Sequence, residues 1–578
     1  MTNIDKIRLM MKDNGVDMYL ILDADYHKSE YVSDYFKARS FISGFTGSNG
    51  SLLVTLDSCY LWTDGRYFIQ AEQELANSDI KLMRIGVKGV LSLLDFIAAN
   101  KGVLGLDGRC MDAAFVNSLK RKKIEVKDLN LIDEIFTDRP SHCNEMAFEL
   151  DIHFSGESRE SKIERLITNS PNSIQIIEHL DAVNYLMNIR AHDINHFPVL
   201  FSYLVVSKDF RWYFADEKKL PHDLKGKLLA EGFEIRPYEN YYQDIASIRD
   251  QTIVMDFNKI SFKSYQEVYL HNVLFNKASY ADMMKACKNE QEIKNLRAAH
   301  IVDGVAMVKF IYKLKKEYAN YDEYTAGRML DEIRLESALE LSFNTIAGYK
   351  ENAAMMHYSA KKESAKKLDK DGMLLVDSGG HYLLGTTDIT RTISFDKVSK
   401  RERKLYTTVL KANLNLASAK FLKGISGVNL DILARNPIWQ LGIDYRSGTG
   451  HGVGYLLSVH EGPHGIRYQK SNLRNEDTKL VEGMVVTDEP GIYLENELGI
   501  RLENELVVYK EFENEYGEFM NFDVITYCPF DRALINKKLL TKAELKQVND
   551  YHKMVYKKLK NHLDEDERKW LKQECAKL

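Results

Sequence analysis

The first part of the chain alternates between the hydrophobic period of an amphipathic helix and that of a strand. IDKIRLMMKDNGVDM at 4–18 has apolar residues at helical spacing, and MYLILD at 18–23 follows as a short buried strand. SLLVTLDSCYLWTDGRYF at 51–68 gives two strand-like runs, separated by Asp57 and Ser58, with Gly65 after the second. This order predicts an α/β domain over residues 1–153.

A weaker version of the same pattern begins near Ser155. SRESKIERLIT at 158–168 predicts a second helix, and FSYLVVSKDFRWYFADEKK at 201–219 again reads as strand, polar break, strand. WTDGRYF and WYFADEK occupy the same relative place. We interpret this as a duplicated unit and expect a second α/β domain over 154–287. The alternative is a chance resemblance of two ordinary α/β stretches.

The pattern changes from Asn289. NEQEIKNLRAAHIVDGVAMVKFIYKLKKEY has helical spacing over 289–318, strand and helix patterns then alternate to about Asp531, and the last forty residues read as helices. We expect a third domain over 288–578 with a helical C-terminal extension. Only nine prolines occur, and no Pro-, Gly- or Ser-rich linker separates the segments, so short ordered connections are expected. The predicted fold class is α/β with three domains.

Charge and composition exclude several classes of protein. Lys and Arg number 79 against 84 Asp and Glu, a net charge of −5 that argues against nucleic-acid binding by bulk electrostatics. No run of 18 apolar residues occurs, so no membrane span is expected, and the N-terminus lacks the apolar core of a signal peptide. The six cysteines are scattered without a CxxC pair, which predicts free thiols in a reducing cytoplasm and gives no support for a zinc–thiolate site.

Two aspartates flank a glycine-rich turn. MLLVD is an apolar strand that ends in Asp377, and Asp388 opens the β-branched run ITRTISF. Such a ribbon can bring both carboxylates to one end of a sheet. Taken alone, the pair has an equally good structural explanation, because aspartates around turns are common.

A histidine bracketed by glycines follows in YRSGTGHGVGYLLSVHEGPHG. The glycines beside His451 let the backbone approach a ligand and leave the imidazole uncovered. His460 and Glu461 come nine and ten residues later. We expect His464, like His381 further upstream, to make only surface or local contacts.

Two glutamates complete the pattern. Glu489 follows an apolar strand in MVVTDEPG and precedes Pro-Gly, which ends the ladder. In LGIRLENELVVY we expect Glu503 inside a strand, where alternation places Arg501, Glu503 and Glu505 on one face. A glutamate on a buried face is costly unless a cation compensates it, whereas on a solvent face it is neutral, so this motif alone is weak.

Together these residues comprise four carboxylates and one imidazole from strand ends of one domain: Asp377, Asp388, His451, Glu489 and Glu503. Four like charges in one pocket would repel, and two divalent cations would balance them. An oxygen-rich donor set with one histidine suits manganese, and less strongly cobalt, iron or zinc. Two such metals can activate a shared water, so the set predicts a hydrolase acting on a carbonyl or phosphoryl centre.

The order and spacing of these motifs resemble the metal signature of the pita-bread metallopeptidases. Within that superfamily the chain is most similar to the Xaa-Pro aminopeptidases of the long, three-domain cytosolic type. Segments outside the metal motifs resemble the same family: RSFISGFTGSNGSLLV with LWTDGRYF in the first domain, LDAVNYLMNIRAHDINHFPVLFSYLVV in the second, and ITYCPFDRALI near the C-terminus. The resemblance implies two creatinase-like N-terminal domains before a pita-bread catalytic domain.

The resemblance also implies roles. The five residues above would ligate two metals, usually manganese, with Asp388 and Glu503 bridging and Glu489 serving as acid/base. His357 would steady the tetrahedral intermediate, His460 would contact substrate and shuttle protons, and Arg66 would bind the peptide. Arg501 would orient metal carboxylates. The implied reaction removes the first residue from peptides with proline second, in a cytoplasmic enzyme that is commonly a homodimer through its catalytic domain.

Two positions depart from the family pattern. Ser447 stands where many relatives have the first histidine of HGTGH, and Leu384 stands where many have an extra aspartate. Neither change removes a predicted ligand, although the first could alter substrate affinity. Two other functions remain open: a prolidase that cleaves only Xaa-Pro dipeptides, against which the paired N-terminal domains argue, and a metal-free binding module, against which the complete ligand set argues.

Overall fold

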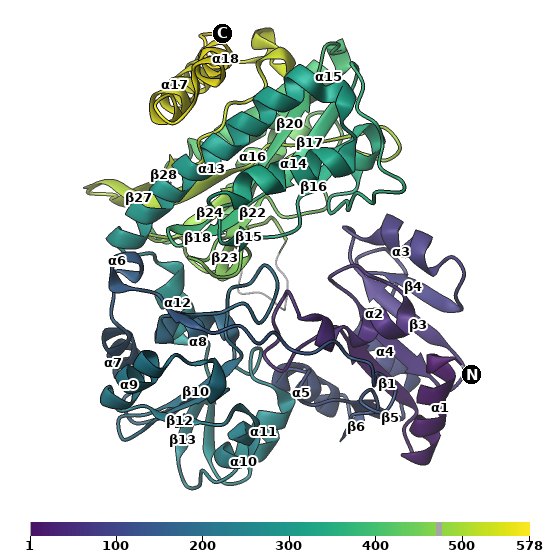
Figure 1. Ribbon diagram of the computed structural model, residues 1–578. Coiled ribbons are helices and arrows are strands. Elements are labelled where there is room, and N and C mark those ends of the chain that lie inside the picture. The colour runs from purple at the N-terminus through teal and green to yellow at the C-terminus, as the bar shows by residue number, and fades with distance from the viewer. Residues whose placement is uncertain (1, 470–476) are drawn as a thin grey trace. The chain divides into compact units, whose positions relative to one another are not determined.

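The structure is a computed structural model that describes residues 2–469 and 477–578, and the chain forms two compact units (Figure 1). The first unit extends to Ile152 and also includes Glu157–Asp282. The second contains His153–Gly156 and Met283–Leu578. All predicted metal ligands belong to the second unit, and Arg66 belongs to the first.

The first unit contains two six-stranded sheets of the same topology. The first sheet has the order β4-β3-β2-β1-β5-β6 and the second β12-β11-β10-β8-β13-β14. In each, the central strand pairs antiparallel on one side and parallel on the other, and both edge strands pair parallel. This identity of order and direction is what the repeated sequence pattern predicts. The strands of the first sheet are β1 (Met18–Leu22), β2 (Ser51–Thr55), β3 (Cys59–Thr63), β4 (Ile80–Arg84), β5 (Val103–Leu106) and β6 (Glu125–Asp128). Those of the second are β8 (Ile174–Ile177), β10 (Ser202–Val206), β11 (Arg211–Ala215), β12 (Glu234–Arg236), β13 (Thr252–Met255) and β14 (Val273–Asn276).

Several helices of this unit begin at side-chain caps that the sequence provides. Thr2 and Asp5 form a reciprocal capping box on α1, and Ser158 caps α7 by accepting the N–H of Ser161. We expected the first helix to run to Met18, but it ends at Asp13, because Gly15 turns the chain with φ of 60°. The main helices are α1 (Asn3–Asp13), α3 (Phe68–Leu75), α4 (Leu93–Asn100), α5 (Ala113–Arg121), α7 (Arg159–Asn169), α8 (Leu180–Met187), α9 (His222–Ala230) and α11 (Phe262–Tyr269).

The second unit is built from short sheets and long helices. A three-stranded antiparallel sheet has the order β16-β17-β20, a six-stranded sheet has the order β21-β28-β27-β24-β22-β23, and β25 and β26 form a hairpin. These strands are β16 (Ile346–Tyr349), β17 (Met373–Ser378), β20 (Ile389–Ser394), β21 (Phe421–Leu422), β22 (Gly450–Gly452), β23 (Glu461–Ile466), β24 (Val485–Asp488), β25 (Gly491–Leu494), β26 (Leu498–Arg501), β27 (Asn504–Asn514) and β28 (Gly517–Val524). The small strands β15 (Glu340–Leu341), β18 (Gly380–Tyr382) and β19 (Gly385–Thr386) form a further sheet.

The long helix expected over 289–318 is α13 (Glu290–Glu317). Asn289 is its N-cap and forms a capping box with Glu292, and Leu296, Val308 and Phe310 are among its buried apolar residues. The other helices of the unit are α12 (Tyr280–Ala286), which spans the division between the units, α14 (Glu323–Leu335), α15 (Lys400–Ala417), α16 (Gly427–Trp439), α17 (Lys542–Leu559) and α18 (Glu565–Glu574). No helix in 2–469 or 477–578 is both long and apolar enough to cross a membrane.

Candidate metal centre

Two antiparallel strands place the aspartates side by side. Asp377 lies in β17 opposite Thr390 of β20, and Asp388 directly precedes β20. Every residue of β17 and β20 is buried, which explains the apolar and β-branched composition of both runs. The turn between these strands therefore brings both carboxylates to one end of the small sheet.

Three ligand-type side chains converge at this point. Donor atoms of Asp388, His451 and Glu503 all lie within 4.8 Å of one another. His451 Nε2 is 3.5 Å from Asp388 Oδ2 and 3.4 Å from Glu489 Oε1. Asp377 is near enough to act electrostatically on both Asp388 and Glu503. The structure thus gathers all five predicted ligands in one pocket.

The backbone sets the orientation of His451. Its Nδ1 lies 2.9 Å from the carbonyl oxygen of Gly452, which can only accept, so Nδ1 carries the proton and donates. The lone pair of Nε2 then faces the carboxylates, as a metal ligand requires. A Cβ on Gly450 would collide with the carbonyl of Thr487, and one on Gly452 with the carbonyl of Glu461, so the glycines permit close strand packing around the histidine.

Glu503 lies outside the strand in which we expected it. It occupies the short connection between β26, which belongs to the β25–β26 hairpin, and β27, which pairs with β24. Its N–H donates to the carbonyl of Thr390 at 3.1 Å, and Thr390 Oγ1 donates to Glu503 Oε2 at 2.7 Å. Both the backbone and the side chain of Glu503 are therefore bonded to β20.

Arg501 and Glu505 form hydrogen bonds with the proposed ligands Asp377 and Asp388. Arg501 donates to Asp377 Oδ2, and its Nη1 donates to Tyr493 Oη at 2.7 Å. Glu505 Oε1 accepts the backbone N–H of Asp388 at 2.7 Å, and Glu505 Oε2 is 3.2 Å from His300 Nε2. The sequence pattern places Glu505 on the same face as Arg501 and Glu503 but assigns it no role. It gives no reason to single out His300, which lies within the helical pattern of α13.

The pocket needs positive charge. Burial and the neighbouring Asp377 carboxylate raise the pKa of Asp388 well above its ordinary value, and burial with the Asp388 carboxylate does the same for Glu503. Arg501 opposes both shifts. Asp377 Oδ1 is buried and accepts no hydrogen bond from any described residue. This donor set fits two divalent cations, which would balance the charge and occupy the unpaired oxygen.

The two further histidines lie around this pocket. The ring of His460 is perpendicular to that of His451, with centroids 4.4 Å apart. His357 is half-buried in the loop after the short helix Lys350–Ala354, and the carbonyl of the preceding Met356 accepts Arg501 Nη2 at 3.4 Å. His381 and His464 are buried and make local contacts, His381 with Thr386 Oγ1 at 3.0 Å and His464 with the carbonyl of Val485 at 2.8 Å.

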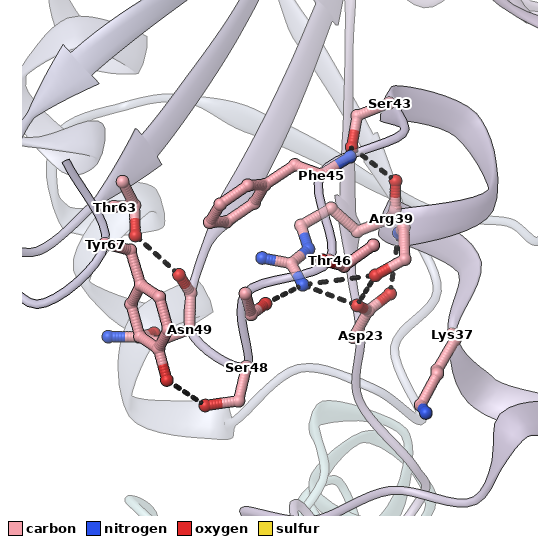
Figure 2. A network of polar contacts seen from close by, with 12 residues as sticks. Asp23, Lys37, Arg39, Ser43, Phe45, Thr46, Ser48, Asn49, Thr63 and Tyr67 are labelled. Carbon is pink, nitrogen blue, oxygen red and sulfur yellow. Dashed lines mark hydrogen bonds and ion pairs between the residues drawn. The ribbon is translucent and has the colours of Figure 1, made fainter. Parts of the chain in front are cut away.

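Arg66 follows β3 in the first unit. Asp64 holds it in a two-point ion pair, with Nε to Oδ1 at 3.0 Å and Nη2 to Oδ2 at 2.8 Å. Asn49 Nδ2 donates to the same Asp64 at 2.6 Å. Buried Arg39 is paired with Asp23 and donates to the carbonyl of Gly47, in the loop that carries Asn49 (Figure 2). The guanidinium of Arg66 is therefore pre-oriented, and its side chain keeps 20% of its surface exposed for a ligand.

Family models cover nearly all of the chain. Metallopeptidase family M24 matches residues 294–510, and the C-terminal region of peptidase M24 matches 518–578. Two models of the creatinase/prolidase N-terminal domain match 3–135 and 138–292.

Named relatives match over most of their length. The chain is 37% identical to "Probable Xaa-Pro aminopeptidase P" of Pyrenophora teres f. teres, over 99% of this chain and 92% of that protein. It is 35% identical to "Xaa-Pro aminopeptidase 1" of Dictyostelium discoideum, over 96% and 92%. The chain belongs to metallopeptidase family M24. The predicted resemblance is confirmed, and this M24 enzyme is a metallo-aminopeptidase.

A solved structure agrees with this assignment of the M24 enzyme. The crystal structure of X-prolyl aminopeptidase from Caenorhabditis elegans, described as a cytosolic enzyme with a di-nuclear active site, aligns with a TM-score of 0.91 at 32% identity, over 97% of this chain and 95% of that one. The Xaa-Pro dipeptidase from Bacillus anthracis aligns with 65% of this chain at 23% identity and a TM-score of 0.51, which shows the fold alone. The predicted fold, two creatinase-like domains before an M24 domain, is confirmed, and the family and the solved structure support two divalent metals.

Proposed function

We propose that this M24 enzyme hydrolyses the peptide bond between the first residue and a proline in second position. The observation that carries the proposal is the convergence of Asp388, His451 and Glu503 within 4.8 Å, with Asp377 and Glu489 beside them. Its full-length relatives are named Xaa-Pro aminopeptidases, which favours this substrate class over dipeptides alone.

Asp377, Asp388, His451, Glu489 and Glu503 would hold two divalent cations. When bound, these ions supply Lewis-acid polarisation of the scissile carbonyl and an activated water. We propose manganese, because oxygen donors dominate the set. We also propose that the chain consists of three domains, at residues 1–153, 154–287 and 288–578.

Residues of the pocket would move the protons. The side chain of Glu489 is 21% exposed, more than those of Asp377 at 12%, His451 at 11% and Asp388 at 5%. It can therefore accept a proton from an incoming nucleophile and pass it toward the proline nitrogen. His460, whose ring contacts His451, would assist that transfer. His357 would donate a hydrogen bond to the carbonyl oxygen as charge develops there.

Two arginines would have separate roles, one toward the substrate and one toward a metal ligand. Arg66 presents a guanidinium that Asp64 fixes in place, which suits it to bind a peptide carbonyl or carboxylate. Arg501 would keep Asp377 in its ligand orientation, because its guanidinium is bonded to Tyr493 on the other side.

Incubation of the manganese-loaded protein with Arg-Pro-Pro, Ala-Pro and Leu-Gly, followed by identification of the products, tests this function. We expect arginine from Arg-Pro-Pro and alanine from Ala-Pro, with Leu-Gly left intact. Cleavage of Ala-Pro alone would favour a prolidase. Absence of any cleavage, with both metals bound, would favour a non-catalytic binding role.

We also propose a cytoplasmic homodimer. All six cysteines are free thiols, and the Caenorhabditis elegans neighbour is described as cytosolic.

On the catalytic unit, α16 exposes Ile432, Leu433 and Trp439, and Trp439 contacts the exposed ring of Tyr468 at 5.9 Å between centroids. A cluster of this kind suits a subunit interface. Light scattering after gel filtration should give twice the chain mass, and Trp439→Glu should lower it toward one chain; a wild-type monomer would contradict the proposal.

A further inference from the structure

A buried ion cluster lies directly beside the proposed proton shuttle. Glu461, the residue after His460, contacts Lys285 and Lys288 with its two carboxylate oxygens: Oε2 is 3.3 Å from Lys285 Nζ, and Oε1 accepts from Lys288 Nζ. The three side chains are at most 1% exposed. None of the catalytic roles described above uses these lysines.

A buried ion cluster is costly to form. Each charged group must leave water, a penalty that apolar packing at the same place would avoid. With two lysines, each carboxylate oxygen of Glu461 faces its own ammonium group, which restricts rotation of the carboxylate. Lys285 Nζ also donates to the carbonyl of Gly462 at 3.3 Å, which fixes the next peptide group as well.

Lys288 and Glu461 are each hydrogen-bonded to, or paired with, backbone close to the proposed metal centre. The backbone N–H of Lys288 donates to the carbonyl of Gly483 at 2.9 Å, just before β24, the strand that leads to Glu489. Glu461 pairs with Gly452 across the irregularity in β22 that follows His451. The cluster therefore links the segment that follows His460 to β22, which carries His451, and to the start of β24, which leads to Glu489.

We propose that Lys285 and Lys288, acting through Glu461, are positioning residues for His460. The assignment rests on the proposed role of His460 in the Xaa-Pro reaction. By fixing the side chain and the following peptide of Glu461, the cluster holds the backbone from which the His460 imidazole reaches the pocket. Its loss should lower turnover through His460 and leave the metal ligands in place.

The experiment is a double-mutant comparison in the manganese-loaded full chain, with kcat and KM on Arg-Pro-Pro and metal content measured for each variant. Glu461→Gln and Lys285→Met should each lower kcat by about 10- to 100-fold, the range typical of groups that orient an active-site histidine, with metal content unchanged. Either change made in a His460→Ala background should lower kcat by less than about twofold more, because coupled residues are non-additive.

Lys285→Met keeps the Glu461–Lys288 pair and provides the answer if Glu461→Gln does not fold. A matched control is Asp193→Asn, which breaks a buried lysine–carboxylate pair with Lys219 in the first unit and should leave kcat unchanged. Unchanged kcat in both cluster variants, loss of metal along with rate, or equal fold-losses with and without His460 would each overturn the positioning role. An inactive wild type would overturn the proposed function itself, and this assignment with it.

Discussion

At the scale of single residues, the two histidines of the GHG and VHEGP motifs differ in what their ring atoms face. The Nδ1 of His451 is committed to the carbonyl of Gly452, so Nε2 is the atom left for a metal, only 3.4–3.5 Å from two carboxylates. His460 contacts the ring of His451 and is not among the converging ligand atoms. The two residues should therefore fail in different ways.

We predict that His451→Ala lowers both metal occupancy and turnover, whereas His460→Ala retains its metals and loses about 10²–10⁴-fold in turnover, the usual contribution of acid–base assistance. Excess manganese should partly rescue His451→Ala by mass action and should not rescue His460→Ala. Metal analysis and kcat on Arg-Pro-Pro check both statements. Metal loss from His460→Ala, with recovery in added manganese, would reverse the two assignments.

The carboxylates make a second prediction about metal content. Four buried or half-buried carboxylates require about two divalent ions to balance them, so manganese loading followed by desalting should leave about two ions per chain. Chelation should abolish activity, and added manganese should restore it. Elemental analysis measures the stoichiometry, and full activity in a metal-free sample would contradict the dimetal interpretation.

At the scale of elements, a buried histidine joins the loop after β1 to two residues that lie outside the strands of the second N-terminal sheet. His27, in the loop after β1, bonds through Nδ1 to the carbonyl of Glu178 at 2.7 Å and through Nε2 to Tyr238 Oη at 2.7 Å. Burial lowers the pKa of His27 to about 4. The unfolded chain would take up a proton near pH 6.5, which the folded chain cannot do until the pH is much lower.

The contribution of His27 to stability should therefore be fully present above pH 6.5 and be lost as the pH falls from 6.5 to 4, by about 3 kcal/mol in total. His27→Gln keeps a polar side chain and does not titrate. We expect the thermal midpoint of the wild type, relative to this variant, to fall between pH 7 and pH 5. An equal difference in midpoint at both pH values would contradict the prediction.

At the scale of the whole molecule, the proposed metal ligands and Arg66 lie in different compact units. Apart from His153–Gly156, the second unit consists of Met283–Leu578 and includes Lys285 and Lys288, so a catalytic fragment should start no later than Met283. This unit also uses His153–Gly156, because Asn289 Nδ2 donates to the carbonyl of Ser155 at 2.8 Å.

We predict that residues 283–578 bind about two metals and have a lower kcat/KM than the full chain on Arg-Pro-Pro, since the fragment lacks Arg66. Arg66→Ala in the full chain should lower kcat/KM in the same direction without changing metal content. Circular dichroism verifies that the fragment is folded. Equal kcat/KM for a folded fragment and the full chain would show that the first unit does not shape the substrate site.

The sequence by itself determined the features that depend on local pattern. Apolar spacing and the Asn289 capping box give α13, and the repeated strand–break–strand pattern gives two sheets of one topology. The five proposed ligands are recognisable because each is a polar residue within one position of a strand end, and glycine or proline borders His451 and Glu489. These signals are short-range and need no knowledge of what lies opposite.

Tertiary structure decided everything that joins distant parts of the chain. Glu503 lies between β26 and β27 and not inside a strand. Its side chain accepts a hydrogen bond from Thr390 of β20, which takes the place of pairing within a β-sheet. Glu505 acquires a role only when folding brings it to the N–H of Asp388, 117 residues away, and Lys288 only when it meets Glu461, 173 residues away. A buried charge is stable only next to its partner, and sequence spacing does not reveal which partner folding will supply.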